Sequence, residues 1–251
     1  MSHGTFVWHD VMSTAPEKAR RFYTELFGWS AIDHPTPEGN YTLFHLGDRK
    51  VGGMVGVDPK GNVPSHWMPY VSVPKLEEAL EKSRELGAKV VFGPMGLPDV
   101  GRWAVVQDPQ GGYVSPFEAA AEMCGPAGDL PPVGAFCWEE LNSTDPAASV
   151  RFYTSLFGWK AESMQLDPLG VYTLLHAGPA QIGGVAPVQG PPMTYWLSYV
   201  HVADVDASSR RAENLGGRVL VPPENIPDIG RFSVIADPAG AVLAFYKSVR
   251  M

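Results

Sequence analysis

A helix-spaced hydrophobic pattern occupies residues 16–27. Apolar side chains recur there three and four positions apart, which places them on one face of an α-helix. Gly28 follows the last of them and is typical of a helix C-terminus. Thr14 and Glu17 have capping-box spacing, so we expect the Thr14 side chain to cap the helix. The apolar face consists of Ala19, Phe22, Tyr23, Leu26 and Phe27.

Short β-rich runs surround this helix and then a second, shorter helix. The first group is predicted to have strands at 5–11, 28–32, 41–46 and 51–57. The second is predicted to have a strand at 67–73, a helix at 76–86 and strands at 89–92, 103–107 and 113–117. Each group has the order β-α-β-β-β. The second half of the chain gives the same pair, beginning at 136–141 and at 195–202.

The whole pattern occurs twice. Residues 8–30 return as residues 138–160, with the shared core RFYTxLFGW offset by 130 positions. Later segments match as well, including YTLFHLG with YTLLHAG and VGG with IGG. A period of domain size indicates tandem domains rather than a solenoid. We expect an α+β chain with domains at 1–120 and 133–251, joined by a linker at 121–132 that is rich in Gly and Pro.

Charge argues against a nucleic-acid partner. The net charge is −8 and no run of Lys and Arg is present, whereas phosphate recognition needs a basic surface. No segment has the apolar length of a membrane span or the form of a signal peptide. We expect a cytoplasmic protein, although signal-free export would escape this test, and either a monomer or a homodimer. Cys124 and Cys137 form neither a disulfide framework nor a zinc motif.

The repeated blocks resemble the vicinal oxygen chelate superfamily, which includes glyoxalase I, bleomycin-resistance proteins and extradiol dioxygenases. The resemblance covers nearly all of both halves. It is carried by the helix ending FYxxLFGW, the strand with two glycines, the segment VADVD at 202–206 and the closing Gly-Arg and Asp-Pro-x-Gly motifs. Within the superfamily, the chain is most similar to two-domain glyoxalase-like proteins of the mycobacterial culture-filtrate antigen type. The resemblance implies tandem cupped mixed sheets built from four βαβββ modules.

The resemblance also implies where a metal would bind. Metal-dependent members hold the ion with side chains on the inward face of the sheet. The corresponding positions are Trp8 and Trp138, Gly53 and Gly184, Met68 and Leu197, and Ser115 and Ala244. Because these residues offer neither imidazole nor carboxylate, we expect no metal and no other cofactor there. A displaced divalent-metal site formed by Glu140, His176 and His201 stays open as an alternative.

Strand alternation identifies the other inward side chains. If Trp8 points inward, so do Phe6 and Asp10, while His9 faces the helices. The same counting turns Trp138 and Glu140 inward in the second half. It adds Tyr70, Ser72, Tyr113 and Phe117 in the first half and Tyr199, His201, Val242 and Tyr246 in the second. Each cavity is therefore expected to have aromatic walls and one acid.

Asp10, Glu140 and His201 are the candidate catalytic residues. A carboxylate on an inward face costs several kcal/mol unless it is paired or solvated. It would therefore either form a structural ion pair with Arg102 or Arg231 or face a ligand. The residues expected to contact a ligand are Trp8, Tyr70, Arg102, Trp138, His176, Tyr199 and Arg231.

Each of these assignments has a structural alternative. The two tryptophans would fill a core, His176 would make a strand-end hydrogen bond, and the Gly-Arg pairs would build turns.

If these residues instead form a site, two functions are possible. In the first, the protein binds a small aromatic or cationic molecule without a metal. In the second, it is a glyoxalase-type lyase or isomerase that acts on a small carbonyl substrate, with Asp10 or Glu140 as base and Tyr70, Tyr199 or His201 as hydrogen-bond donors.

Overall fold

The computed structural model describes residues 3–36, 39–121, 130–166, 170–190 and 192–249. Cys124 and most of the predicted linker lie outside these ranges. Among the described residues no helix is long and apolar enough to cross a membrane.

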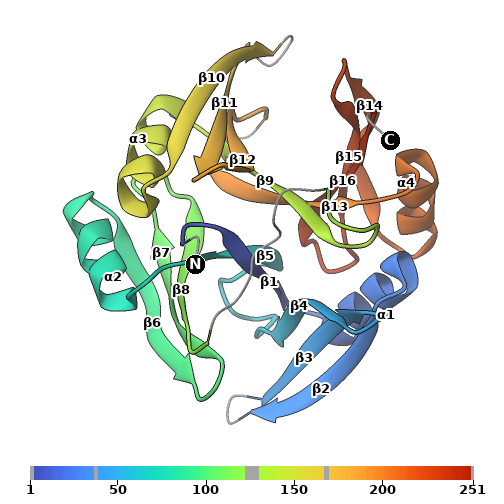
Figure 1. Ribbon diagram of the computed structural model, residues 1–251. Coiled ribbons are helices and arrows are strands. Elements are labelled where there is room, and N and C mark those ends of the chain that lie inside the picture. The colour runs from blue at the N-terminus through green and yellow to red at the C-terminus, as the bar shows by residue number, and fades with distance from the viewer. Residues whose placement is uncertain (1–2, 37–38, 122–129, 167–169, 191, 250–251) are drawn as a thin grey trace. The chain divides into compact units, whose positions relative to one another are not determined.

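The first half contains two β-α-β-β-β modules, as predicted (Figure 1). The sequence predicted all ten elements, and the observed strands extend a few residues beyond several predicted ends. In chain order they are β1 (Phe6–Ser13), α1 (Pro16–Phe27), β2 (Ser30–Thr36), β3 (Gly39–Leu46), β4 (Arg49–Gly56), β5 (His66–Ser72), α2 (Leu76–Glu85), β6 (Lys89–Leu97), β7 (Gly101–Gln107) and β8 (Tyr113–Ala119).

The second half repeats the same order, which confirms the α+β class and the four modules. Its elements are β9 (Phe136–Ser143), α3 (Pro146–Phe157), β10 (Lys160–Leu166), β11 (Gly170–Ala177), β12 (Ala180–Pro187), β13 (Tyr195–His201), α4 (Val205–Asn214), β14 (Arg218–Ile226), β15 (Gly230–Ala236) and β16 (Val242–Ser248).

Each half forms one mixed eight-stranded sheet. The strand order is β2-β3-β4-β1-β5-β8-β7-β6 in the first and β10-β11-β12-β9-β13-β16-β15-β14 in the second. The pairs β1–β4, β5–β8, β9–β12 and β13–β16 are parallel. The hairpins on either side of them are antiparallel.

The compact units of the structure do not follow the two halves of the sequence. Unit 1 comprises residues 1–8, 68–129 and 139–197, and unit 2 comprises residues 9–67, 130–138 and 198–251. Each unit therefore combines the first module of one half with the second module of the other. Helices α2 and α3 are in contact in unit 1, and helices α1 and α4 are in contact in unit 2 (Figure 1).

Each unit has its own hydrophobic core. In unit 2, residues of α1 and of β16 pack together, among them Phe22, Tyr23 and Phe245. In unit 1, residues of α3 pack with residues of α2, among them Phe152, Tyr153 and Leu76. Complete burial of such side chains stabilises each unit by roughly 1.5–3 kcal/mol per residue.

A Trp–Tyr–Asp chain of hydrogen bonds crosses the core of unit 2. Trp67 Nε1 donates to the Tyr23 hydroxyl at 2.9 Å, and that hydroxyl donates to Asp237 Oδ2 at 2.9 Å. The other carboxylate oxygen of Asp237 accepts from the backbone amides of Ala239 and Ala241. Every polar atom of the chain therefore has a partner, which burial requires. Burial raises the pKa of the Asp237 carboxyl and, more strongly, the pKa of the Tyr23 hydroxyl.

Unit 1 contains the equivalent chain. Trp196 Nε1 donates to the Tyr153 hydroxyl at 3.0 Å, which donates to Asp108 Oδ2 at 2.7 Å. Gln110 and Gly112 supply the backbone amides to Asp108. The repeated Tyr of the FYT motif and the Asp of the Asp-Pro motif thus build the same internal brace in both units.

The capping box predicted for α1 does not form. The Thr14 hydroxyl lies 3.0 Å from Ser65 Oγ, and the N-cap is Ala15, whose side chain makes no capping hydrogen bond. In the second copy the N-cap is Asp145, which accepts from the Ala148 amide at 3.0 Å. The sequence signal failed because Thr14 precedes the N-cap by one position and its hydroxyl instead contacts the segment that leads into β5. The predicted C-terminus of α1 is confirmed, since the C-cap residue Gly28 has the left-handed backbone conformation, with φ 71°.

Candidate functional site

The acid predicted near the centre of the first sheet is paired with a tyrosine. Asp10 in β1 is only 6% exposed, and its Oδ1 accepts a hydrogen bond from the Tyr41 hydroxyl of β3 at 2.8 Å. Gly53 of β4 is the register partner of Asp10. A Cβ at position 53 would overlap both the Tyr41 hydroxyl and Asp10. Glycine at this position therefore leaves the space in which the Asp10–Tyr41 pair forms.

The second sheet has a related but different arrangement. Glu140 in β9 is the register partner of Gly184 in β12, and its Oε1 accepts from the Asn142 side chain at 3.2 Å. A Cβ at position 184 would overlap the Tyr172 hydroxyl. Burial raises the pKa of Tyr195, and the nearby Glu140 carboxylate raises it further. Glu140 is half-buried, so the acid of the second half is more accessible than Asp10.

Core membership shows which face of β13 and β16 the predicted residues occupy. Val200 and Val202 belong to the core of unit 2, as does Phe245. Their neighbours Tyr199, His201 and Tyr246 alternate with them and therefore lie on the opposite face of the sheet. Tyr199 and His201 are nonetheless buried, at 6% and 4% exposure.

In unit 1, β5 shows the same alternation. Val71 is a core residue, and Tyr70 lies on the opposite face with 5% exposure. Its ring packs edge-on against Phe117 at 6.2 Å between centroids. The residues that replace the expected first ligands, Trp8 and Trp138, are half-buried within β1 and β9.

Phe6, predicted to point into the cavity with Trp8 and Asp10, instead lies in the core of unit 1. Its ring packs 5.3 Å from that of Trp196 and 5.6 Å from that of Trp159 in the core of unit 1. The prediction failed because the first residues of β1, up to Trp8, belong to unit 1 and the rest of the strand belongs to unit 2, so the two ends of the strand pack in different cores. His9 does face a core as predicted, since it stacks on Phe136 at 3.9 Å.

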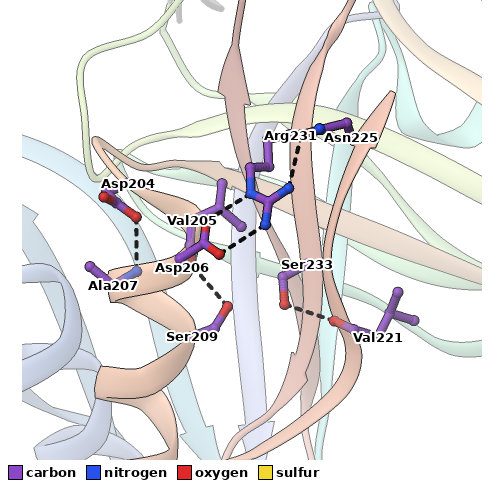
Figure 2. A network of polar contacts seen from close by, with 9 residues as sticks. All are labelled: Asp204, Val205, Asp206, Ala207, Ser209, Val221, Asn225, Arg231 and Ser233. Carbon is purple, nitrogen blue, oxygen red and sulfur yellow. Dashed lines mark hydrogen bonds and ion pairs between the residues drawn. The ribbon is translucent and has the colours of Figure 1, made fainter. Parts of the chain in front are cut away.

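The arginines of the two Gly-Arg motifs, Arg102 and Arg231, each form an ion pair with a carboxylate in the first turn of a helix. Figure 2 shows Arg231, whose Nε and Nη2 donate to both oxygens of Asp206 at 2.7 and 2.8 Å, while Nη1 donates to Asn225. Arg102 forms an ion pair with Glu77 at the start of α2 through a single contact, between Nη2 and Oε1 at 2.5 Å. Hydrogen bonding by Arg231 lowers the pKa of Asp206, and hydrogen bonding by Arg102 lowers the pKa of Glu77. Each guanidinium thus has carboxylate partners on the helix side of its sheet.

The histidines of the two halves differ in their surroundings. His201 Nδ1 lies 2.7 Å from the Pro131 carbonyl oxygen. His176 Nε2 lies 3.8 Å from Glu162 Oε2, which is too long for a hydrogen bond. Within the described ranges, His45 Nδ1, His176 Nε2 and His201 Nε2 are buried ring nitrogens without a hydrogen-bond partner.

The residues at the expected metal positions do not fit a metal. The first two positions carry indole and glycine, and the glycines lie against tyrosine hydroxyl groups. Nowhere in the described part of the chain do three His, Cys, Asp or Glu side chains come together in a way that could hold an ion. This also counts against the displaced site of Glu140, His176 and His201.

Sequence reasoning missed Tyr41 and Tyr172 as site residues. Both belong to the repeated YTL segment, whose strand pairs with the strand of the repeated double glycine, so the paired repeats were the available signal. Their role depends on a side chain reaching diagonally across a neighbouring strand, which strand alternation does not reveal.

A family model described as the Glyoxalase/Bleomycin resistance protein/Dioxygenase superfamily matches residues 6–114 and 136–245. The chain belongs to this superfamily. The two matched segments correspond to the two halves of the repeat, so each half is a superfamily domain by sequence.

Among the relatives of this superfamily member is the putative glyoxylase CFP32 of Mycobacterium tuberculosis, which is 32% identical over 250 residues, 97% of this chain and 95% of that protein. The anthracycline biosynthesis protein DnrV of Streptomyces peucetius is 35% identical over 130 residues, which cover 45% of this chain and 47% of that protein.

Two solved structures share the fold at low sequence identity. The Mn(II)-bound glyoxalase from Novosphingobium aromaticivorans has a TM-score of 0.68 and 16% identity, over 97% of this chain and 82% of that one. The 2,3-dioxygenase LapB from Pseudomonas sp. KL28 has a TM-score of 0.69 and 12% identity, over 98% of this chain and 93% of that one.

Proposed function

We propose that this glyoxalase-superfamily protein binds small aromatic molecules without the metal ion that many of its relatives use. The Asp10–Tyr41 pair carries this proposal. A tyrosine hydroxyl and a carboxylate occupy the space beside Gly53, where the resemblance would place a metal ligand. The pair offers a ligand hydrogen-bonding groups in place of a coordination site.

Aromatic side chains support the choice of ligand class. Tyr70 lies edge-on to Phe117, and the half-buried Trp8 and Trp138 flank the two acids along their strands. Stacking and cation–π contacts contribute about 0.5–2 kcal/mol each, so several of them suffice for micromolar binding. The partial similarity to a protein named for anthracycline biosynthesis agrees with a polycyclic aromatic ligand.

Two measurements test this proposal together. Protein purified without chelators or a metal-affinity tag is analysed for metal, and binding of N-methylquinolinium, a permanently charged aromatic probe, is followed by calorimetry. We expect less than about 0.1 metal ion per chain and saturable binding that is weakened about tenfold by Trp8→Ala or Trp138→Ala. Tyr113→Ala is the control, because the Tyr113 ring, predicted to point into the cavity, is 44% exposed in the structure. Stoichiometric zinc, nickel, iron or manganese would refute the metal-free part of the proposal.

A glyoxalase-type activity is the second candidate, and the Asp10–Tyr41 contact is the observation in its favour. A carboxylate can remove a proton beside a carbonyl group, and an adjacent hydroxyl can stabilise the resulting oxyanion. The similarity to a protein named a putative glyoxylase agrees with this chemistry. Turnover of a methylglyoxal–thiol adduct by metal-free protein, abolished in Asp10→Asn and retained in Tyr113→Phe, would establish it. No turnover in any metal-free preparation would rule it out.

A further inference from the structure

Four neighbouring strands in each half carry a row of side chains in direct register. The first row lies in unit 1 and consists of Ser72, Phe117, Trp103 and Met95 on β5, β8, β7 and β6. The second row lies in unit 2 and consists of His201, Tyr246, Phe232 and Glu224 on β13, β16, β15 and β14. Register partners on adjacent strands point to the same face of a sheet, so each row is a continuous surface.

Both rows lie on the face opposite the cores. Val71 and Ala104, which adjoin the first row in sequence, are core residues of unit 1. Val200 and Phe245, which adjoin the second row, are core residues of unit 2. Three strand spacings separate the ends of a row, a span of about 14 Å, which suits a planar molecule of two to four fused rings.

The chemistry of the two rows differs at both ends. The first row ends in Met95 and begins at Ser72, whose hydroxyl is already hydrogen-bonded to the backbone of Thr5. The second row begins at an imidazole and ends at the exposed carboxylate of Glu224. The central pairs, Phe117 with Trp103 and Tyr246 with Phe232, are aromatic in both.

His201 gives the second row an acceptor. The Pro131 carbonyl can only accept a hydrogen bond, so the proton of the neutral ring lies on Nδ1 and Nε2 carries a lone pair. In the described part of the chain that Nε2 is buried and has no partner, in a side chain that is 4% exposed. An unsatisfied buried acceptor is costly, so a ligand that supplies a donor gains affinity there.

We propose that the second row binds a planar aromatic compound bearing a hydroxyl group, which donates to His201 Nε2 while the ring lies against Tyr246 and Phe232. The first row binds aromatic rings that lack such a donor. The two halves of the duplicated chain therefore differ in ligand class. This inference rests on the proposed function, because it assumes that these sheet faces bind aromatic molecules.

A matched pair of probes tests it. Calorimetry is carried out with 2-naphthol and with 2-methoxynaphthalene, which have the same ring system but differ in the hydroxyl donor. We expect the wild-type protein to bind 2-naphthol about tenfold more tightly at one site. His201→Phe removes the acceptor and should abolish that preference, whereas His201→Gln keeps an acceptor oxygen and should retain part of it. Glu213→Gln, which changes an exposed carboxylate on α4 outside both rows, should leave the affinity for 2-naphthol unchanged.

The outcomes separate this inference from the proposed function. If both naphthalenes bind and His201→Phe leaves their ratio unchanged, the role of His201 is refuted and aromatic binding stands. If neither naphthalene nor N-methylquinolinium binds, the proposed function fails and this inference fails with it. Should His201→Phe not fold, equal affinities of the two naphthalenes for the wild-type protein would refute the inference, and partial retention of the preference in His201→Gln would support it.

Discussion

The hydroxyl of Tyr23 donates a hydrogen bond to Asp237, 214 positions away in the sequence. Tyr153 and Asp108 make the same contact in the other compact unit. In both units the tyrosine comes from one copy of the repeat and the aspartate from the other. The brace thus ties the two copies together within each unit, which explains why two motifs at opposite ends of a domain recur in both halves.

Removing the hydroxyl from this brace should destabilise the protein. Tyr23→Phe leaves the Trp67 indole N–H without its acceptor and Asp237 without one donor, all within a buried core. We expect the free energy of unfolding in urea to fall by about 1–3 kcal/mol. Tyr113→Phe, which loses an exposed hydrogen bond to Gln107, should change it by less than about 0.5 kcal/mol. Equal stabilities of the two variants would contradict the structural role of the brace.

The buried aspartates should give an unusual pH dependence of stability. Burial raises the pKa of Asp237 in the folded state, so the folded protein binds its proton more readily than the unfolded chain does. The contribution of this group is therefore largest below its unfolded pKa and is lost as the pH rises through its folded pKa. We expect the stability of wild type relative to Asp237→Asn to increase as the pH is lowered from 7 to 4.

The pKa of Asp33 is shifted in the opposite direction to that of Asp237, so the stability contribution of Asp33 should change with pH in the opposite sense. Hydrogen bonds from Thr42 and Arg20 lower its pKa in the folded state, so its contribution is present above the unfolded pKa and decreases as the pH falls. The stability of wild type relative to Asp33→Asn should accordingly decrease over the same range. Denaturant unfolding at several pH values measures both stability differences. If the two differences changed with pH in the same direction, this account would be disproved.

The Arg231–Asp206 contact predicts a local change in titration. Because Arg231 lowers the pKa of Asp206, mainly through hydrogen bonding, Arg231→Ala should return that pKa toward its ordinary value. NMR titration of the Asp206 carboxyl carbon would show the shift. Asp33, whose pKa is lowered by hydrogen bonds from Thr42 and Arg20, is the reference signal in the same spectrum and should keep its pKa in Arg231→Ala.

Gly53 should be intolerant of even a small side chain. A methyl group at this position would overlap Tyr41 and Asp10 and force the pair apart. We expect Gly53→Ala to lower the free energy of unfolding by about 1–3 kcal/mol and to weaken binding of N-methylquinolinium. In Gly56→Ala, at the end of the same strand, the nearest atom to the new Cβ would be Pro16 Cγ at 3.6 Å, so little change is expected. Unchanged binding in Gly53→Ala would argue against the Asp10–Tyr41 site.

The sequence by itself determined the elements and their order. Hydrophobic spacing located the helices, strand-forming runs located the strands, and the repeat showed that both halves share one fold, because these signals are local and occur twice. Alternation along a strand also placed Tyr199 and His201 opposite the core, since adjacent side chains in a strand point to opposite faces.

Tertiary structure decided which distant segments meet. Only the fold brings Tyr23 to Asp237 and Tyr41 to Asp10, which lies beyond Gly53. Only the fold places Arg231 where it donates hydrogen bonds to Asp206. It also divides the chain into compact units that mix the two halves, so that Phe6 enters a core that its own strand pattern does not indicate. The physical reason is that local sequence fixes backbone conformation and side-chain direction, whereas partners far apart in the chain are fixed by how the modules pack.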